Sequence, residues 1–310
     1  MHNFSKKSLK HILLVSILLI GVLLRFHGIS NQSLWLDELA SWETSAKPDI
    51  QSVIQRTQND VHPPGFHLLL YYIEKYLGDS EWHLRLPSAV GGVVAIYLMY
   101  LIGTLLYSYR EGLLAAALLA SSWTPIYYSQ EARVYSLLLC FGLGSVYFGL
   151  LLLQQLRSSN TLPWYPLGGY IVTATILCYL HYFGVLLVGL EAVWLSVFFL
   201  KNRRTFQYTC IVFLCIFILY SPWIPSLLMH FNRVNEGTST LPAPTLKTVE
   251  QYLLYIFNWV DWYLYCLIAP LLVIYLVKKI VCFSIAPIFF FFQIPKFTCI
   301  FGEMPWLLVN

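Results

Sequence analysis

The sequence predicts an all-α polytopic membrane protein, and three observations carry this prediction. Of its 310 residues, 58% are hydrophobic and only 11% are charged, whereas an average soluble domain has about 25% charged residues. Apolar runs long enough to cross a bilayer recur along the chain, and a helix satisfies every backbone hydrogen bond within such a run. Basic residues recur between the runs at positions that fit one consistent topology.

The first span is predicted over residues 11–29, and the three lysines before it place its start in the cytoplasm. Arg25 and His27 stand where the small residues of a cleavage site would be. This run is therefore interpreted as an uncleaved first span and not as a signal peptide.

A long, acid-rich extracytoplasmic loop, about 30–85, is predicted to follow. Its mostly apolar run 66–77 is only 12 residues long, whereas a span needs about 20, so it is expected to be an interfacial helix. If it crossed, the basic cluster 201–204 would face outward, against the positive-inside rule. The total is about eight or nine spans, the later ones predicted over 86–107, 112–128, 135–156, 164–180, 183–200, 208–228 and 262–277.

Residues 1–279 are predicted to form one transmembrane domain, and 280–310 an atypical apolar tail. This tail is interpreted as either a further span or the truncated or out-of-frame ending of a longer chain. The seven cysteines include no CxxC pair and mostly lie in apolar runs, which favours buried hydrophobes over metal ligands. No basic stripe with interleaved aromatics is present, so nucleic-acid binding is not expected.

Asp37 and Glu38 are the leading candidates for chemistry. They lie between Trp35 and Trp42 just after the first span, and tryptophans gather at the bilayer edge. Adjacent carboxylates at this depth are costly unless something nearby uses them. The alternative is that they are helix caps or solvated loop acids.

Further polar residues stand at other predicted connections. In His62-Pro-Pro-Gly the prolines indicate the start of a helix, but they do not explain the histidine. Arg133 could bind a phosphate with two hydrogen bonds or pair internally with Glu131, and both interpretations are left open. His181 is either a substrate or metal contact or an interfacial ring. The topology brings one set of polar residues to the extracytoplasmic side: Asp37, His62, Glu131, Arg133, His181 and His230.

Five sequence blocks together resemble a known family. They are LWLDE (34–38), HPPGFHLLLYY (62–72), GDSEWHLRLPSAVGG (78–92), YYSQEARVYSLL (127–138) and HYFG (181–184). In this order they resemble the GT-C integral-membrane glycosyltransferases, in particular the bacterial dolichyl-phosphate-mannose-protein mannosyltransferase-like branch related to the aminoarabinose-lipid A transferases. The resemblance covers about residues 10–275 and stops near Lys279, whereas family members are generally longer.

This resemblance implies a GT-C-like helical bundle and the transfer of one sugar. The donor would be a polyprenyl-phosphate sugar, and the acceptor a lipid, glycan or protein at the extracytoplasmic face of a bacterial plasma membrane. Asp37 matches the family's general base in an inverting displacement, and Glu38 matches its neighbour. The residues expected to bind the donor phosphate or substrate are Arg85, Glu131, Arg133, Tyr128, Tyr135, His62 and His181.

The sequence leaves the need for a metal and the activity of the chain open. A divalent metal is compatible with the sequence but not required by it, and Glu131, His62 and His181 are its candidate ligands. One alternative to an active enzyme is an inactive, truncated remnant of one. A lipid or sugar transporter is less favoured, because neither a repeated half nor a mid-span acid other than Glu191 is seen.

Overall fold

The computed structural model describes residues 6–60, 62–158, 163–199, 203–235 and 245–247. The chain divides into two units, Met1–Pro242 and Ala243–Asn310, and every helix named below belongs to the first. The described residues form helices and no strand, which confirms the all-α class. The predicted span 262–277 and the tail 280–310 lie outside the described residues, so the domain boundary at 279 stays a prediction.

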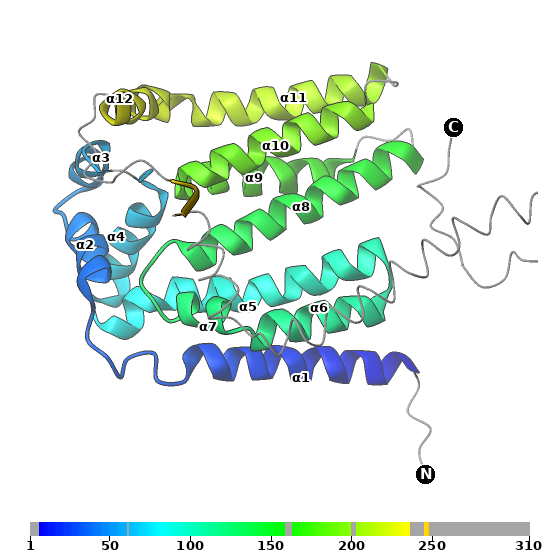
Figure 1. Ribbon diagram of the computed structural model, residues 1–310, viewed down its shortest axis with the longest axis horizontal. Helices are drawn as coiled ribbons and strands as arrows, with labels where there is room; N and C mark the ends of the chain where they lie inside the picture. The colour runs from blue at the N-terminus through cyan, green and yellow to red at the C-terminus, as the bar shows by residue number, and fades with distance from the viewer. Residues whose placement is uncertain (1–5, 61, 159–162, 200–202, 236–244, 248–310) are drawn as a thin grey trace, which may run out of the picture. The chain divides into compact units, whose positions relative to one another are not determined.

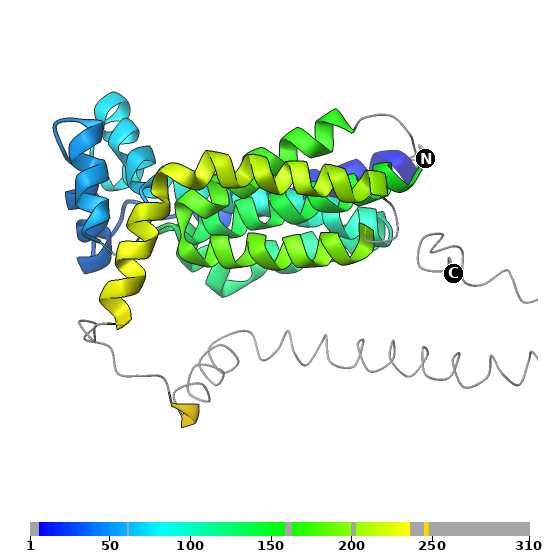
Figure 2. The same ribbon diagram turned by 90° about the horizontal axis from the view of Figure 1, so that it is seen from above.

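Seven helices of the first unit run alongside one another (Figures 1 and 2). Helix α5 packs against α1, α6 and α8, and α9 packs against α8, α10 and α11. Within the described residues, four stretches are long and apolar enough to cross a membrane by themselves: Ser8–Phe26, Glu81–Leu106, Tyr135–Leu156 and Phe206–Asn232. The seven helices are α1 (Lys6–Phe26), α5 (Glu81–Leu106), α6 (Tyr109–Ser121), α8 (Tyr135–Ser158), α9 (Trp164–Leu180), α10 (Tyr182–Phe199) and α11 (Arg203–Tyr220).

Two predicted spans are interrupted. The run 112–128 divides into α6 and α7 (Trp123–Ser129), because Ser122 takes an extended backbone and its hydroxyl donates to the Leu118 carbonyl. The run 208–228 ends as a long helix at Tyr220, and the chain turns through η1 (Ser221–Trp223) into α12 (Ile224–Asn235), as Figure 2 shows.

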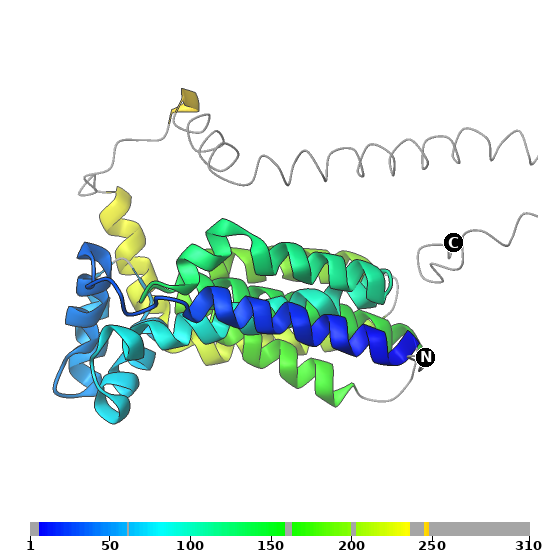
Figure 3. The same ribbon diagram turned by 90° about the horizontal axis from the view of Figure 1, so that it is seen from below.

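Three shorter helices gather at one end of the long ones (Figures 1 and 3): α2 (Leu36–Ser45), α3 (Ile50–Gln58) and α4 (Gly65–Leu77). Helix α4 contacts both α2 and α3. It begins directly after Pro64, and its last residue is followed by Gly78, whose φ of 106° favours glycine. Its place beside α2 and α3 agrees with the interfacial interpretation of residues 66–77.

Arg25 joins the end of α1 to the neighbouring helix. Its side chain is fully buried and donates to the carbonyls of Leu119 and Ala120, each at 3.1 Å, in the last turn of α6. A cation is favourable there because the last carbonyls of a helix carry partial negative charge. A Cβ at Gly92 would lie 2.8 Å from Arg25 Nε, so the close approach of α5 requires glycine.

An apolar cluster lies where α4 meets α5, α8 and α9. It joins Phe66 and Leu70 to Leu84, Val134 and Leu180. Because these side chains come from four chain segments, their burial holds the loop before α8 against the end helices.

The predicted convergence of polar residues is found at this same end. Arg133 reaches Asp37, the rings of His62 and His181 meet, and His230 bonds to the Gln58 carbonyl. The long helices therefore bring residues of four sequence-distant connections together at one end, as the alternating topology predicts. The side of the membrane on which this end lies stays a prediction.

Candidate active site

Glu38 and Arg85 form a buried ion pair. Arg85 Nε donates to Glu38 Oε1 at 2.8 Å, and Nη2 donates to Oε2 at 2.7 Å. The exposed fractions of the two side chains are 6% for Arg85 and 0% for Glu38. This is the bidentate geometry that gives an arginine–carboxylate pair its strength.

The same two side chains bind four chain segments together. Arg85 Nη1 also donates to the carbonyls of Ile29 and Gln32, at 2.7 and 2.8 Å. Glu38 Oε1 accepts from the Ala132 amide at 2.6 Å, and Oε2 accepts from the Trp35 amide, which caps α2. The pair is saturated by protein groups. This geometry favours a positioning role over the catalytic role predicted for Glu38 and the substrate contact predicted for Arg85.

Asp37 is in the opposite situation. Its carboxylate is 46% exposed, and its Oδ2 lies 3.6 Å from Arg133 Nη2, which is an ion pair but not a hydrogen bond. Arg133 Nη1 instead donates to the Asp37 carbonyl at 3.1 Å and to Ser41 Oγ at 3.3 Å. The guanidinium lies over the Tyr135 ring, 5.7 Å from its centroid. Arg133 Nε is buried and finds no hydrogen-bond partner among the described residues, so the guanidinium retains unused donor capacity.

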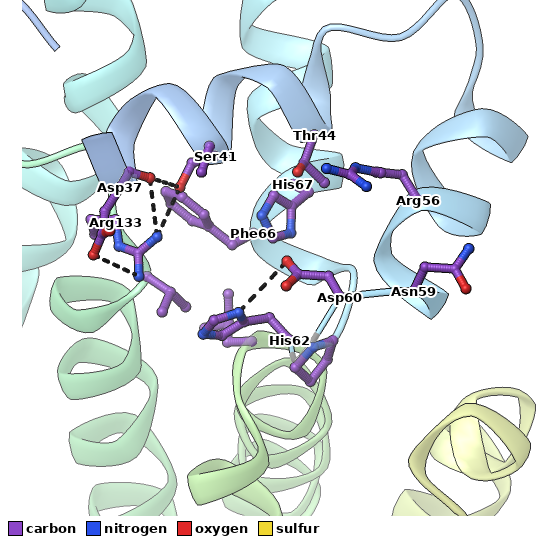
Figure 4. A pocket seen from close by; sticks show the side chains of 14 residues that line it. Asp37, Ser41, Thr44, Arg56, Asn59, Asp60, His62, Phe66, His67 and Arg133 are labelled. Atoms are coloured by element: carbon purple, nitrogen blue, oxygen red, sulfur yellow. Dashed lines mark hydrogen bonds and ion pairs between the residues drawn. The ribbon is translucent and has the colours of Figure 1, made fainter. Parts of the chain in front are cut away.

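Asp37 and Arg133 line a cavity of about 340 Å³ between α2, α3, α4 and the start of α8. Figure 4 shows these two residues on one side and His67, Asp60 and Asn59 on the other. The lining residues are Asp37, Ala40, Ser41, Thr44, Arg56, Asn59, Asp60, His62, Pro63, Phe66, His67, Arg133, Val134 and Leu180. Of the predicted site residues, the structure brings Asp37, His62 and Arg133 to this cavity.

Glu131 lies close by, but it does not line the cavity and it is 7% exposed. Burial raises the pKa of its carboxyl, with a contribution from the charge of Glu38, while a hydrogen bond from Tyr127 opposes the shift. Among the described ion pairs, Arg133 takes Asp37 and not Glu131. The internal Glu131–Arg133 pair considered from the sequence is therefore not formed.

The two predicted tyrosines support the arginine indirectly. Tyr135 lies beneath the Arg133 guanidinium, and Tyr128 packs on Tyr135 with 4.8 Å between the ring centroids. The contact geometry makes these rings a platform for Arg133.

His62 and His181 meet edge to face, with 5.3 Å between ring centroids. His62 Nδ1 lies 3.7 Å from Asp60 Oδ2. His181 Nδ1 accepts from the Phe183 amide at 3.1 Å. Burial, with the nearby charges of His62 and Arg133, lowers the pKa of His181 to about 4, so its ring is neutral at pH 7.

The three candidate metal ligands do not gather at one point. His62 and His181 are neighbours, whereas no contact joins Glu131 to either ring among those described. The part of the chain that the structure describes contains no group of three His, Cys, Asp or Glu side chains placed to hold one metal ion.

Sequence reasoning missed six polar residues of the cavity: Ser41, Thr44, Arg56, Asn59, Asp60 and His67. Ser41 and Thr44 follow Asp37 by four and seven residues, a helical spacing that places all three on one face. That signal was available in the sequence. His67 was hidden because it lies within an apolar run, where a single histidine is ordinarily a core residue.

Comparison with known proteins identifies a family and a fold. The family model described as dolichyl-phosphate-mannose-protein mannosyltransferase matches residues 61–226. No curated protein matches the chain. Among solved structures, the chain is similar to the S. cerevisiae protein O-mannosyltransferase Pmt1-Pmt2 complex bound to the sugar donor, with a TM-score of 0.52 and 15% identity.

That structural match covers 75% of this chain and 34% of the yeast chain, so this chain spans about a third of that relative's length. At this identity the likeness establishes the fold alone. It confirms the predicted GT-C-like transmembrane helical fold.

Proposed function

Since the chain belongs to the dolichyl-phosphate-mannose-protein mannosyltransferase family, we propose that it is a membrane glycosyltransferase with Asp37 as its general base. It moves one sugar from a polyprenyl-phosphate donor to an acceptor hydroxyl at the extracytoplasmic face. One observation carries the proposal: a half-exposed carboxylate and a largely buried guanidinium share one cavity at the end of the helices. The first is a base and the second a phosphate ligand.

The reaction is a single displacement. Asp37 accepts the proton of the acceptor hydroxyl while the hydroxyl oxygen attacks the anomeric carbon of the donor sugar. The new carbon–oxygen bond forms on the face opposite the phosphate. The bond from the anomeric carbon to the phosphate oxygen breaks, and its electron pair leaves with the polyprenyl phosphate. The anomeric configuration is therefore inverted, and the proton remains on Asp37.

Arg133 stabilises the charge that develops on the leaving phosphate. Its side chain is 14% exposed, so its charge acts through a medium of lower dielectric than water. Its Nε has no hydrogen-bond partner among the described residues, and its Nη2 makes only the loose ion pair with Asp37. This spare donor capacity suits a phosphate, which arginine binds with two parallel hydrogen bonds.

The buried Glu38–Arg85 pair holds in place the helix that carries Asp37. It fixes the first turn of α2, where Asp37 lies, against α5 and the segment that leads to Arg133. A base held in place in this way loses less free energy to ordering when the substrates bind.

The test uses purified chain in lipid nanodiscs with a panel of polyprenyl-phosphate sugars, and it measures released polyprenyl phosphate. We expect the wild-type chain to release polyprenyl phosphate from at least one donor and the Asp37→Asn variant to release none above background. The matched control is Glu43→Gln, which removes an exposed acid of the same helix and is expected to leave the activity unchanged. Equal release by wild-type chain and Asp37→Asn would remove Asp37 as the base.

A further inference from the structure

The cavity has a second wall that the proposed transfer chemistry does not use. Asn59 and Asp60 follow the end of α3, and His67 lies in the first turn of α4. Figure 4 shows them across the cavity from Asp37 and Arg133. This wall has polar side chains of several chemical kinds, and the proposed transfer step gives none of them a role.

His67 is the central group of this wall. It is 6% exposed, and its Nδ1 has no partner in hydrogen-bonding geometry among the described residues. A buried polar atom without a partner costs free energy, and a ligand in the cavity would supply the missing bond. Burial lowers the pKa of His67 to about 4, although the charge of Asp60 and the backbone of Pro63 oppose the shift. The ring is therefore neutral at pH 7 and has one donor and one acceptor nitrogen.

The chemistry around His67 matches a neutral, hydroxyl-rich ring. Asp60 provides carboxylate oxygens, Asn59 an amide, and Thr44 a hydroxyl, so neighbouring sugar hydroxyls could each donate and accept. Phe66 adds an apolar surface for the C–H face of a ring. Next to His67 a neutral group is favoured over an anionic one, because the charge of Asp60 acts on the imidazole. The donor phosphate is placed at Arg133, across the cavity.

We propose that Asn59, Asp60 and His67 form a subsite that binds a sugar ring of the acceptor. This inference rests on the proposed function, because the base must contact the accepting hydroxyl and the rest of the acceptor must then fill the adjoining space. The cavity of about 340 Å³ is near the lower limit of the usual range for ligand pockets, about 300–1,000 Å³. Because the donor sugar and phosphate share this cavity under the proposed function, the space left at the second wall suits one ring better than a peptide segment.

The first test is binding without turnover. The 310-residue chain in nanodiscs is mixed with methyl glycosides of mannose, glucose and galactose, and saturation transfer from protein to ligand is measured by NMR. The competing probes are acetylated serine and threonine pentapeptides. We expect at least one glycoside to give a signal and the peptides to give none. Signals from the peptides alone would overturn the proposal in favour of a protein acceptor.

Variants then locate the binding site. We expect His67→Leu to weaken glycoside binding about tenfold, since one hydrogen bond is lost, and His67→Gln to restore it to within about twofold. Asn59→Ala is a second probe at the surface end of α3, where loss of the fold is not expected, and it should weaken binding about threefold. Tyr72→Phe, on the exposed side of α4, is the control and should bind as the wild type does. Unchanged binding in both His67→Leu and Asn59→Ala would overturn the assignment.

A final arm separates the acceptor sugar from the donor sugar. The Asp37→Asn variant is saturated with the polyprenyl-phosphate sugar found in the transfer assay, or with each panel member if none is turned over. Continued glycoside binding supports an acceptor subsite, and displacement would assign the wall to the donor sugar and overturn the proposal. A glycoside that binds to a chain without transferase activity would contradict the proposed function but leave the sugar subsite standing, so the two failures are distinguishable.

Discussion

Two neighbouring acids of one helix, Glu38 and Asp37, differ in almost every physical respect. Each faces an arginine from another part of the chain. Glu38 is fully buried and makes two hydrogen bonds to Arg85, at 2.7 and 2.8 Å. Asp37 is 46% exposed and lies 3.6 Å from the Arg133 guanidinium, without a hydrogen bond between the side chains. The buried pair is suited to holding the helix in place, and the open pair retains the freedom to bind ligands.

The difference arises from helix geometry. Successive residues of an α-helix point about 100° apart, so Glu38 faces the packed segments while Asp37 faces the cavity. Both acids lie in the first turn of α2, where the helix dipole favours negative charge. The dipole therefore favours both acids, and burial separates their roles.

The largest expected effect concerns the open pair. We expect Asp37→Asn to lower the transfer rate by at least about 10²-fold, because general-base catalysis contributes about 10²–10⁴-fold. Its melting temperature in detergent should stay within about 2 °C of the wild-type value, since a half-exposed acid without side-chain hydrogen bonds contributes little to stability. The comparison between the two acids would be wrong if this variant lost its fold along with its activity.

The buried pair should show the opposite pattern. Arg85→Met leaves the Glu38 carboxylate buried without its partner, and we expect a loss of about 3–5 kcal/mol in the free energy of unfolding. Thermal denaturation followed by tryptophan fluorescence measures this loss. The double variant Glu38→Leu/Arg85→Met removes both charges and should recover part of the stability. An Arg85→Met chain as stable as the wild type would show that the pair does not hold the end helices together.

The third prediction concerns pH and the buried imidazole opposite the open pair. Burial lowers the pKa of His67 to about 4, below the value of about 6.5 expected in the unfolded chain. The neutral ring therefore contributes its full stability above about pH 6.5, and this contribution is lost as the pH falls toward 4. Between pH 7 and 4.5 the loss is about 2–3 kcal/mol.

The measurement is the melting temperature of wild-type chain and His67→Gln across this range. The wild type should lose more stability on acidification than the variant does. Glu131, whose pKa is raised by burial, acts in the opposite direction in both chains and cancels in the comparison. Equal slopes for the two chains would show that His67 does not titrate in this way.

The smallest expected effect tests the geometry of the open pair. Arg133→Lys keeps the charge but loses the planar fork, so we expect about a tenfold fall in kcat/KM for the donor. The melting temperature should change little, because the ion pair with Asp37 is loose. A lysine variant with wild-type kinetics would mean that only the charge at this position matters. A fall as large as that of Asp37→Asn would give Arg133 an equal share in the chemistry.

Much of the site could be anticipated from local patterns. Asp37 stood out because it lies beside the first predicted span. The positive-inside count then placed Asp37, Arg133 and His62 on the same predicted side of the membrane. The structure joins these residues at one cavity. The resemblance that carried their predicted roles is confirmed at the level of the family, and the roles themselves stay predictions.

Other features were beyond local patterns. Glu38 and Asp37 are adjacent acids that a sequence cannot rank, and Arg85 is 47 residues away from the carboxylate it binds. From the sequence His67 resembles a core histidine. Only the packing of α2 and α3 beside α4 shows that it lines a cavity. The internal pairing of Glu131 with Arg133 was equally plausible from sequence, because their distance along the chain says nothing about which acid the guanidinium reaches.

The sequence by itself determined the helical membrane class, the order of the long helices and the end at which the polar connections meet. Hydrophobicity and charge act locally and add along the chain, so a single sequence is sufficient to read them. Only the tertiary structure decided that Glu38 is buried against Arg85, that Asp37 stays open beside Arg133 and that His67 faces the same cavity. These outcomes depend on which distant surfaces pack together, and packing is set by the fit of whole helices.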